Sequence, residues 1–215
     1  MKRIALLFIA TYACISSATG LKSLEEFVKT VKTGKADFSQ VVTAPAKDGM
    51  APKVKTSTGQ FEFARPNHFR FTYTKPFEQT IVADGQTLWL YDVDLNQVTA
   101  RQQASVLGST PAALIASAAD VQALKADFVL TDAPDKDGLQ WVTATPKAKD
   151  GQLQTVRIGF IAAADAPGST LQVLEILDNF GQRSVLTFKQ FQTNPVLPSS
   201  AFTFKPPAGA DVIKP

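Results

Sequence analysis

The sequence predicts a mainly β protein whose strands pair antiparallel in one large, strongly curved sheet. Apolar and polar residues alternate with a period of two through most of the chain, as in strands with one buried face. Turn dipeptides such as Asp84-Gly85 and Asp137-Gly138 separate these runs at hairpin distances. Short hairpins join antiparallel strands, because parallel pairs need long crossovers. The pattern gives about ten or eleven strands, and a sheet of that size must curl or close.

Composition places the chain among globular proteins and excludes several kinds of site. Its 215 residues are 45% hydrophobic and 19% charged, which fits one domain. With a single Cys, Cys14, and a single His, His68, it cannot build a Cys/His zinc site or an internal disulfide. We expect no metal and no cofactor. Removing Lys2 and Arg3 with a leader would lower the formal net charge from +3 to +1, which leaves nucleic-acid binding without its usual electrostatic driver.

The first 20 residues have the layout of a secretory signal peptide. A positive start precedes an apolar stretch over 4–15, and small residues follow it. The apolar stretch is well short of the roughly 20 residues that cross a bilayer. Cleavage after Ala18 or after Gly20 fits the small residues at this boundary. We therefore expect a leader over 1–20 and a single domain over 21–215, with an uncleaved anchor as the alternative.

Cys14 bears on whether the chain carries a lipid. A bacterial lipoprotein has Leu and two small residues before its lipidated Cys. Here Thr11-Tyr12-Ala13 precede Cys14, and only Ala13 fits that pattern. We expect Cys14 to leave with the leader, and lipidation is the less favoured alternative.

The mature chain begins with an amphipathic helix over 23–32. Ser23 and Glu26 have the spacing of a capping box, and Gly34 is a natural C-terminal stop. The apolar residues at helical spacing are Leu24, Phe27, Val28 and Val31.

Strands then follow in quick succession. The segment 44–57 holds Pro45, Gly49 and Pro52 and is predicted to be a loop. The strands of this half are expected over 36–42, 58–63, 69–73, 78–83, 87–91 and 96–101. Within them, Phe61 and Phe63 share one face, and so do Phe69, Phe71 and Tyr73.

An Ala-rich segment over 105–125 interrupts the strands. Thr110-Pro111 is a typical helix start, and Leu114 and Ile115 supply an apolar side. A further short helix is expected over 120–125. The later strands are expected over 128–131, 139–145, 153–161, 171–177 and 183–191.

The sequence offers no convincing catalytic group. His68 would have to serve any Ser-His-Asp triad, and no Gly-x-Ser-x-Gly elbow accompanies it. Asp92 and Asp94 lack the Gly and the further ligands of a calcium loop, so we favour a role in a turn. Arg65 has the strand parity of Phe63 and lies either at the rim of an apolar face or exposed at a strand end. The pattern alone favours exposure. We expect a protein that is not an enzyme.

Five stretches, in this order and spacing, carry a resemblance to a known family. They are GQFEFARPNHFRFTY over 59–73, QTIVADG over 79–85, LWLYD over 88–92, TPAALIA over 110–116 and FTFKPPAG over 202–209. Together they resemble the outer-membrane lipoprotein carrier (LolA) family over essentially the whole mature chain.

The resemblance implies a fold and a task. The fold is an incomplete antiparallel β-barrel with helices as a lid over an apolar cavity. The task is that of a monomeric periplasmic chaperone, which receives lipoproteins from an inner-membrane ABC transporter and passes them to an outer-membrane receptor, LolB.

The resemblance also assigns roles to individual residues. Arg65 would bond carbonyls of the lid helix and keep the empty cavity closed, and Phe69 would handle the lipoprotein. The lid-helix residues are Ala112, Ala113, Leu114, Ile115 and Ala116. The candidates for lining the acyl cavity are Val28, Phe61, Phe63, Phe69, Phe71, Tyr73 and Leu90. The sequence departs from the family at Phe71, where Trp is common, and at Ala112 and Ala113, where some relatives have larger apolar residues.

Three alternatives stay open. The first is the outer-membrane receptor of the same fold, which is anchored by an N-terminal lipid. The second is a periplasmic protein that binds or processes lipids, such as an esterase. The third is a structural β domain with an ordinary packed core, which an accessible apolar cavity beneath 105–125 would exclude.

Overall fold

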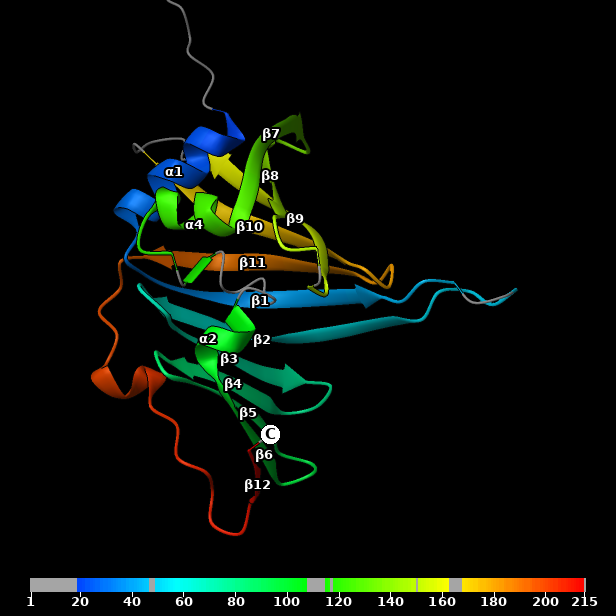
Figure 1. Ribbon diagram of the computed structural model, residues 1–215, viewed down its shortest axis with the longest axis vertical. Helices are drawn as coiled ribbons and strands as arrows, with labels where there is room; N and C mark the ends of the chain where they lie inside the picture. Colours follow the sequence, from blue (N-terminus) through cyan, green and yellow to red (C-terminus); the bar gives the residue numbers. More distant parts are fainter. Residues whose placement is uncertain are drawn as a thin grey trace, which may run out of the picture.

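Twelve strands form one continuous, strongly curved sheet in the computed structural model (Figure 1). The structure describes residues 19–46, 49–107, 115–116, 118–149, 151–162 and 168–214. The strand order is β12-β6-β5-β4-β3-β2-β1-β11-β10-β9-β8-β7. The end strands β12 and β7 do not pair with each other, so the sheet stays open. The predicted fold class, a mainly β protein with an incompletely closed antiparallel sheet, is confirmed.

The strands agree closely with the alternation in the sequence. The first half comprises β1 (Thr33–Thr43), β2 (Val54–Ala64), β3 (His68–Lys75), β4 (Gln79–Asp84), β5 (Thr87–Asp92) and β6 (Gln97–Gln102). The second half comprises β7 (Phe128–Lys136), β8 (Leu139–Pro146), β9 (Leu153–Ala162), β10 (Ser169–Asp178) and β11 (Arg183–Thr193). Pairing among these strands is antiparallel, as predicted.

One strand has no counterpart in the prediction. The short β12 (Asp211–Ile213) pairs in parallel with β6. It follows a 3-10 turn, η1 (Ser199–Phe202), which lies against β3 and β4, and an extended segment. Three residues are too few for alternation to be visible in the sequence. The strand forms because β6 offers it an unpaired edge.

The first helix starts and ends earlier than predicted. It is α1 (Gly20–Thr30), and the Thr19 side chain caps it by accepting the Lys22 N–H. Ser23 does not cap the helix: its hydroxyl is buried and donates to Gln140 Oε1 at 2.5 Å. The predicted capping box is therefore wrong, because tertiary packing draws the Ser23 side chain toward β8.

Two further boundaries differ from the prediction. Gly34 belongs to β1 instead of ending the helix, and a Cβ there would lie 2.8 Å from Cζ of Phe63. The strand β2 begins at Val54, inside the predicted loop, because Val54 pairs with Thr43 of β1. The long hairpin formed by β1 and β2 extends beyond the rest of the sheet (Figure 1).

The segment between the two halves of the sheet contains helices, as predicted. They are α2 (Gln103–Leu107) and α4 (Val121–Asp127), and the Asp120 side chain caps α4 by accepting the Ala123 N–H. The predicted start at Thr110-Pro111 lies outside the described residues.

The core fills the concave side of the sheet. The apolar face of α1 lies against β7, β8, β9 and β10, and α4 lies beside it (Figure 1). Leu24, Phe27 and Val28 of α1 are at most 2% exposed. Helix α1 therefore covers the half of the concave face that is formed by β7–β10.

Candidate functional site

An apolar cavity of about 250 Å³ lies between the two halves of the curved sheet. Its walls come from β1, β3, β4, β5, β10 and β11. The lining residues are Gln40, Phe69, Phe71, Tyr73, Ile81, Leu88, Leu90, Leu174, Ile176 and Leu186. Gln40 and the Tyr73 hydroxyl are the polar groups in this set, so the cavity offers mainly hydrocarbon to a ligand.

Strand register explains why these side chains meet. Phe71 is paired with Ile81, and Ile81 with Leu90, so the three stand in one row across β3, β4 and β5. Leu174 and Leu186 form a pair on β10 and β11. The two halves contribute facing apolar walls because the sheet curves back on itself.

Four of the seven residues predicted to line the cavity do so, namely Phe69, Phe71, Tyr73 and Leu90. Val28, Phe61 and Phe63 do not line the described cavity. They are 0% exposed and belong to the packed core beside it. The ring of Phe61 lies 4.4 Å from that of Phe71, centroid to centroid, because the two residues are paired on β2 and β3, so Phe61 packs beside the cavity wall.

Sequence reasoning missed the wall supplied by Ile81, Leu88, Leu174, Ile176 and Leu186. Their alternation was visible, since each has the apolar parity of its strand. The sequence could not show which apolar strand residues would line a cavity and which would be packed in the core, because that depends on how distant segments pack.

A hydrogen-bonded polar row crosses one end of the cavity. The Tyr73 hydroxyl donates to Gln40 Oε1 at 3.0 Å, and Gln40 Nε2 donates to Ser184 Oγ at 2.8 Å. Burial raises the pKa of Tyr73 to about 12, because desolvation disfavours the phenolate. The Tyr73 side chain is therefore a neutral hydroxyl at physiological pH.

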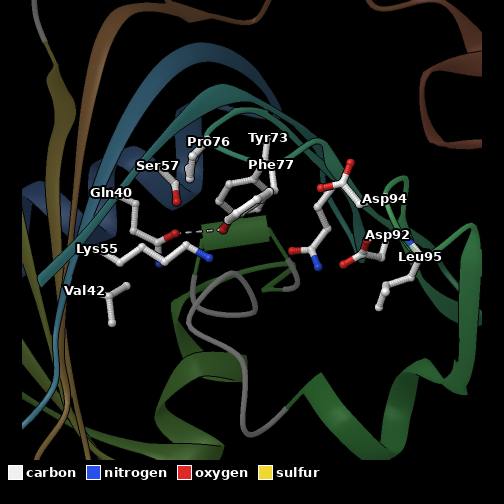
Figure 2. A pocket seen from close by; sticks show the side chains of 11 residues that line it. Gln40, Val42, Lys55, Ser57, Tyr73, Pro76, Phe77, Asp92, Asp94 and Leu95 are labelled. Carbon is white, nitrogen blue, oxygen red and sulfur yellow. Dashed lines mark hydrogen bonds between the residues drawn. The ribbon is translucent and has the colours of Figure 1, made fainter. Parts of the chain in front are cut away.

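A second, more polar hollow of about 420 Å³ adjoins this row (Figure 2). We call it the vestibule. It shares Gln40 and Tyr73 with the apolar cavity. Its other lining residues are Val42, Lys55, Ser57, Pro76, Phe77, Gln79, Asp92, Asp94 and Leu95. The concave face thus changes from apolar to polar at the Gln40–Tyr73 pair.

Arg65 lies at the opposite end of the apolar region. Its guanidinium carbon is 4.9 Å from the ring centroid of Phe63 and 5.0 Å from that of Phe27, so it stacks on two aromatic faces. The position at the rim of an apolar face is confirmed, and the exposed alternative is wrong. Burial lowers the pKa of Arg65 to about 10, and the side chain still carries its charge at neutral pH.

The described hydrogen bond of the Arg65 side chain is made to α1. Nη1 donates to the carbonyl of Val31, at the end of α1. Among the described residues, Nε and Nη2 are buried without a hydrogen-bond partner. The family pattern points to carbonyls of 112–116 as the acceptors, but Ala112, Ala113 and Leu114 lie outside the described residues. Bonding to those carbonyls therefore stays a prediction.

The described part of the predicted lid is held beside Arg65. Ile115 and Ala116 are 3% and 0% exposed, and the Ala116 carbonyl accepts the Asn67 N–H at 3.1 Å. The turn between β2 and β3 therefore contacts α1 through Arg65 and the 115–116 segment through Asn67.

A buried amide supports this turn. Gln103 is 1% exposed; its Nε2 donates to the Asn67 carbonyl at 2.7 Å, and its Oε1 accepts the Gly85 N–H at 2.9 Å. It is a positioning residue that no sequence pattern revealed.

The remaining titratable candidates have structural roles. Asp92 accepts the Leu95 N–H at 3.1 Å, as expected for a turn. Burial opposes ionisation of Asp84, but hydrogen bonds from the Thr87 N–H, Trp89 Nε1 and the Gln86 N–H outweigh it and lower its pKa. His68 Nδ1 lies 2.8 Å from the Pro66 carbonyl oxygen. Within the described ranges, no group of three or more His, Cys, Asp or Glu side chains is placed to hold a metal ion.

None of the helices described here is both long and apolar enough to cross a membrane.

Among known structures, a LolA superfamily protein from Nitrosomonas europaea has a similar fold, with a TM-score of 0.50 and 14% identity. That match covers 87% of this chain and 99% of the other.

Sequence comparisons are much closer. The model of the family described as outer membrane lipoprotein carrier protein LolA matches residues 29–205. The outer-membrane lipoprotein carrier protein of Albidiferax ferrireducens is 71% identical over 214 residues, which span 100% of each chain. That of Methylibium petroleiphilum is 50% identical over 211 residues, covering 98% of this chain and 97% of the relative. The chain therefore belongs to the LolA family of outer-membrane lipoprotein carrier proteins.

Proposed function

We propose that this protein is a periplasmic chaperone that carries lipoproteins from the inner membrane to the outer membrane. The supporting observation is the apolar cavity between the two halves of the sheet, which is lined by ten residues of which eight are purely hydrocarbon. The family membership and the names of the relatives agree with this role.

The physical need for such a carrier is large. Burying one CH₂ group is worth about 0.8 kcal/mol, so a chain of about 16 carbons in water represents on the order of 10 kcal/mol. A lipoprotein cannot cross an aqueous compartment at that cost. We propose that an inner-membrane ABC transporter loads the carrier and that the outer-membrane receptor LolB unloads it, because each acyl chain must pass directly between apolar sites.

The cavity must widen to accept its cargo. At about 250 Å³ it is smaller than the roughly 300–1,000 Å³ of ordinary small-molecule pockets, and lipoproteins carry several acyl chains. Two elements of the core packed beside the cavity can move away from the β2–β3 turn. They are α1, which accepts a hydrogen bond from Arg65, and the 115–116 segment, which accepts one from Asn67.

Arg65 would tune the affinity for cargo by favouring the closed state. Opening at α1 breaks its bond to Val31 and separates its guanidinium from the Phe27 ring. The free energy that opening costs lowers the net affinity for acyl chains, which permits release to the receptor.

Release of a labelled lipoprotein from spheroplasts by the purified chain, starting at Thr19, tests the proposal. We expect a soluble one-to-one complex. A folded protein that releases no lipoprotein would refute the carrier role. Mass spectrometry of the native N-terminus separately tests the receptor alternative, which requires a lipid on Cys14.

A further inference from the structure

We propose that the vestibule is the binding site for the polar part of the cargo: the glyceryl ester linkage and the first peptide residues of a bound lipoprotein. This inference rests on the proposed function, because it assumes that acyl chains occupy the adjoining cavity. It adds a direction to the cargo, with the acyl chains beyond the Gln40–Tyr73 pair and the polypeptide leaving through the vestibule.

The first argument is the match between two boundaries. A lipid-modified cysteine changes from hydrocarbon to ester carbonyls and then to peptide within a few bonds. The concave face changes in the same order, from the apolar cavity to the Tyr73–Gln40 hydrogen bond and then to the vestibule (Figure 2). Only these two residues line both hollows.

The second argument is the supply of hydrogen-bonding groups. Ester and amide carbonyls accept hydrogen bonds, and the Lys55 ammonium is a donor on the vestibule wall, whereas the Tyr73 hydroxyl already donates its proton to Gln40 Oε1. Peptide N–H groups donate, and Gln79, Asp92 and Asp94 provide acceptor oxygens. Lys55 and Asp94 lie on opposite sides of the hollow, so a peptide between them meets donors on one side and acceptors on the other (Figure 2).

The third argument is that the other end of the apolar region is closed. Phe27, Phe61 and Phe63 are at most 1% exposed there, and Arg65 covers the rings of Phe27 and Phe63. The hollow of about 410 Å³ that is described at that end is lined by Ala64 and His68, which have the strand parity opposite to Phe63 and Phe69, so it lies on the other face of the sheet from the acyl cavity. The vestibule, by contrast, has about 420 Å³, which is within the usual range of ligand pockets.

Its wall is also partly ordered before cargo arrives. The Lys55 ammonium lies 5.2 Å from the ring centroid of Phe77, and Phe77 is 57% exposed. A large aromatic ring held open to solvent beside a cation is suited to contact a peptide backbone and its side chains.

A substitution that fills the vestibule separates its role from that of the cavity. We would introduce Ser57→Trp and measure binding of two probes, palmitate and a synthetic diacylglyceryl-cysteinyl lipopeptide, by displacement of a fluorescent fatty acid. We expect the lipopeptide to bind at least about tenfold more weakly, as loss of a few favourable contacts implies, while palmitate changes by less than about twofold. Thr56→Trp is the matched control, because Thr56 is exposed on the opposite face of the same strand.

Each result has a distinct meaning. Equal weakening of both probes, or of neither, in a Ser57→Trp variant with an unchanged melting temperature would overturn the vestibule assignment. If the wild-type protein binds neither probe, the proposed function itself fails.

Cross-linking provides a second measurement that does not fill the site. A photoreactive phenylalanine analogue at position 77 is expected to label the polypeptide of a loaded lipoprotein. The matched control is position 180, where Phe180 is 73% exposed on the turn between β10 and β11. A loaded complex in which position 77 labels no more cargo than position 180 would overturn the assignment while leaving the carrier function intact.

Discussion

Replacing Gly20 by alanine tests how α1 is seated on the sheet. A Cβ at this position would lie well inside 3.0 Å of the Trp141 carbonyl and 2.8 Å from the Val142 nitrogen. Both neighbours are backbone atoms of β8, which cannot move without disturbing the pairing of β8 with β7 and β9. The substitution therefore forces α1 away from the sheet.

Two effects of opposite sign compete in Gly20→Ala. Helix propensity favours alanine over glycine by up to about 1 kcal/mol. Overpacking of a tight contact typically costs about 1–3 kcal/mol, and displacement of α1 also loosens Leu24, Phe27 and Val28. Because the obstructing atoms belong to the backbone, we expect the steric effect to win, with a net loss of about 1–2 kcal/mol.

Urea unfolding followed by circular dichroism measures this change. Lys22→Ala is the matched control, because Lys22 is an exposed residue in the same helical turn and should change stability by less than about 0.5 kcal/mol. If Gly20→Ala proved as stable as the wild-type protein, the close seating of α1 on β8 would be refuted.

Four other predictions follow from described contacts. Arg65→Leu removes the bond to Val31 that favours closure, so we expect normal loading but slower transfer to the receptor in a two-step transfer assay; transfer at the wild-type rate would contradict the latch role. Gln103→Leu leaves the Asn67 carbonyl and the Gly85 N–H unpaired, which should lower the unfolding free energy by about 2–4 kcal/mol in urea titrations; a change below about 0.5 kcal/mol would argue against it. The pKa of Asp84 is lowered from its ordinary value of 3.8, so ionised Asp84 stabilises the fold above pH 3.8, and this stabilisation is lost as the pH falls through the folded-state pKa. The difference in unfolding free energy between the wild type and Asp84→Asn should therefore shrink in acid. A difference that stays constant with pH would contradict this sign. Because Thr19 caps α1 and Gly20 packs on β8, we expect signal cleavage after Ala18 and not after Gly20, and intact-mass measurement of the exported protein should find Thr19 as the first residue.

Alternation in the sequence determined most of the sheet and the direction of its side chains. A period of two places Phe69, Phe71 and Tyr73 on one face whatever the tertiary arrangement, and hairpin turns require antiparallel neighbours. These properties depend on residues a few positions apart, so they can be read locally. The resemblance added the expectation of an apolar cavity, and four of its proposed lining residues proved to be in the wall.

Only the tertiary structure decided which part of that apolar face stays open. Phe61 and Phe71 have the same inward orientation and pair directly, yet Phe61 is fully buried in the core and Phe71 lines the cavity. The partners of Arg65 and Tyr73, namely Val31 and Gln40, lie 34 and 33 positions away along the chain. The need for glycine at position 20 arises from Trp141, on a strand far along the chain. Such features depend on how distant segments pack, and periodicity within a single strand carries no information about that packing.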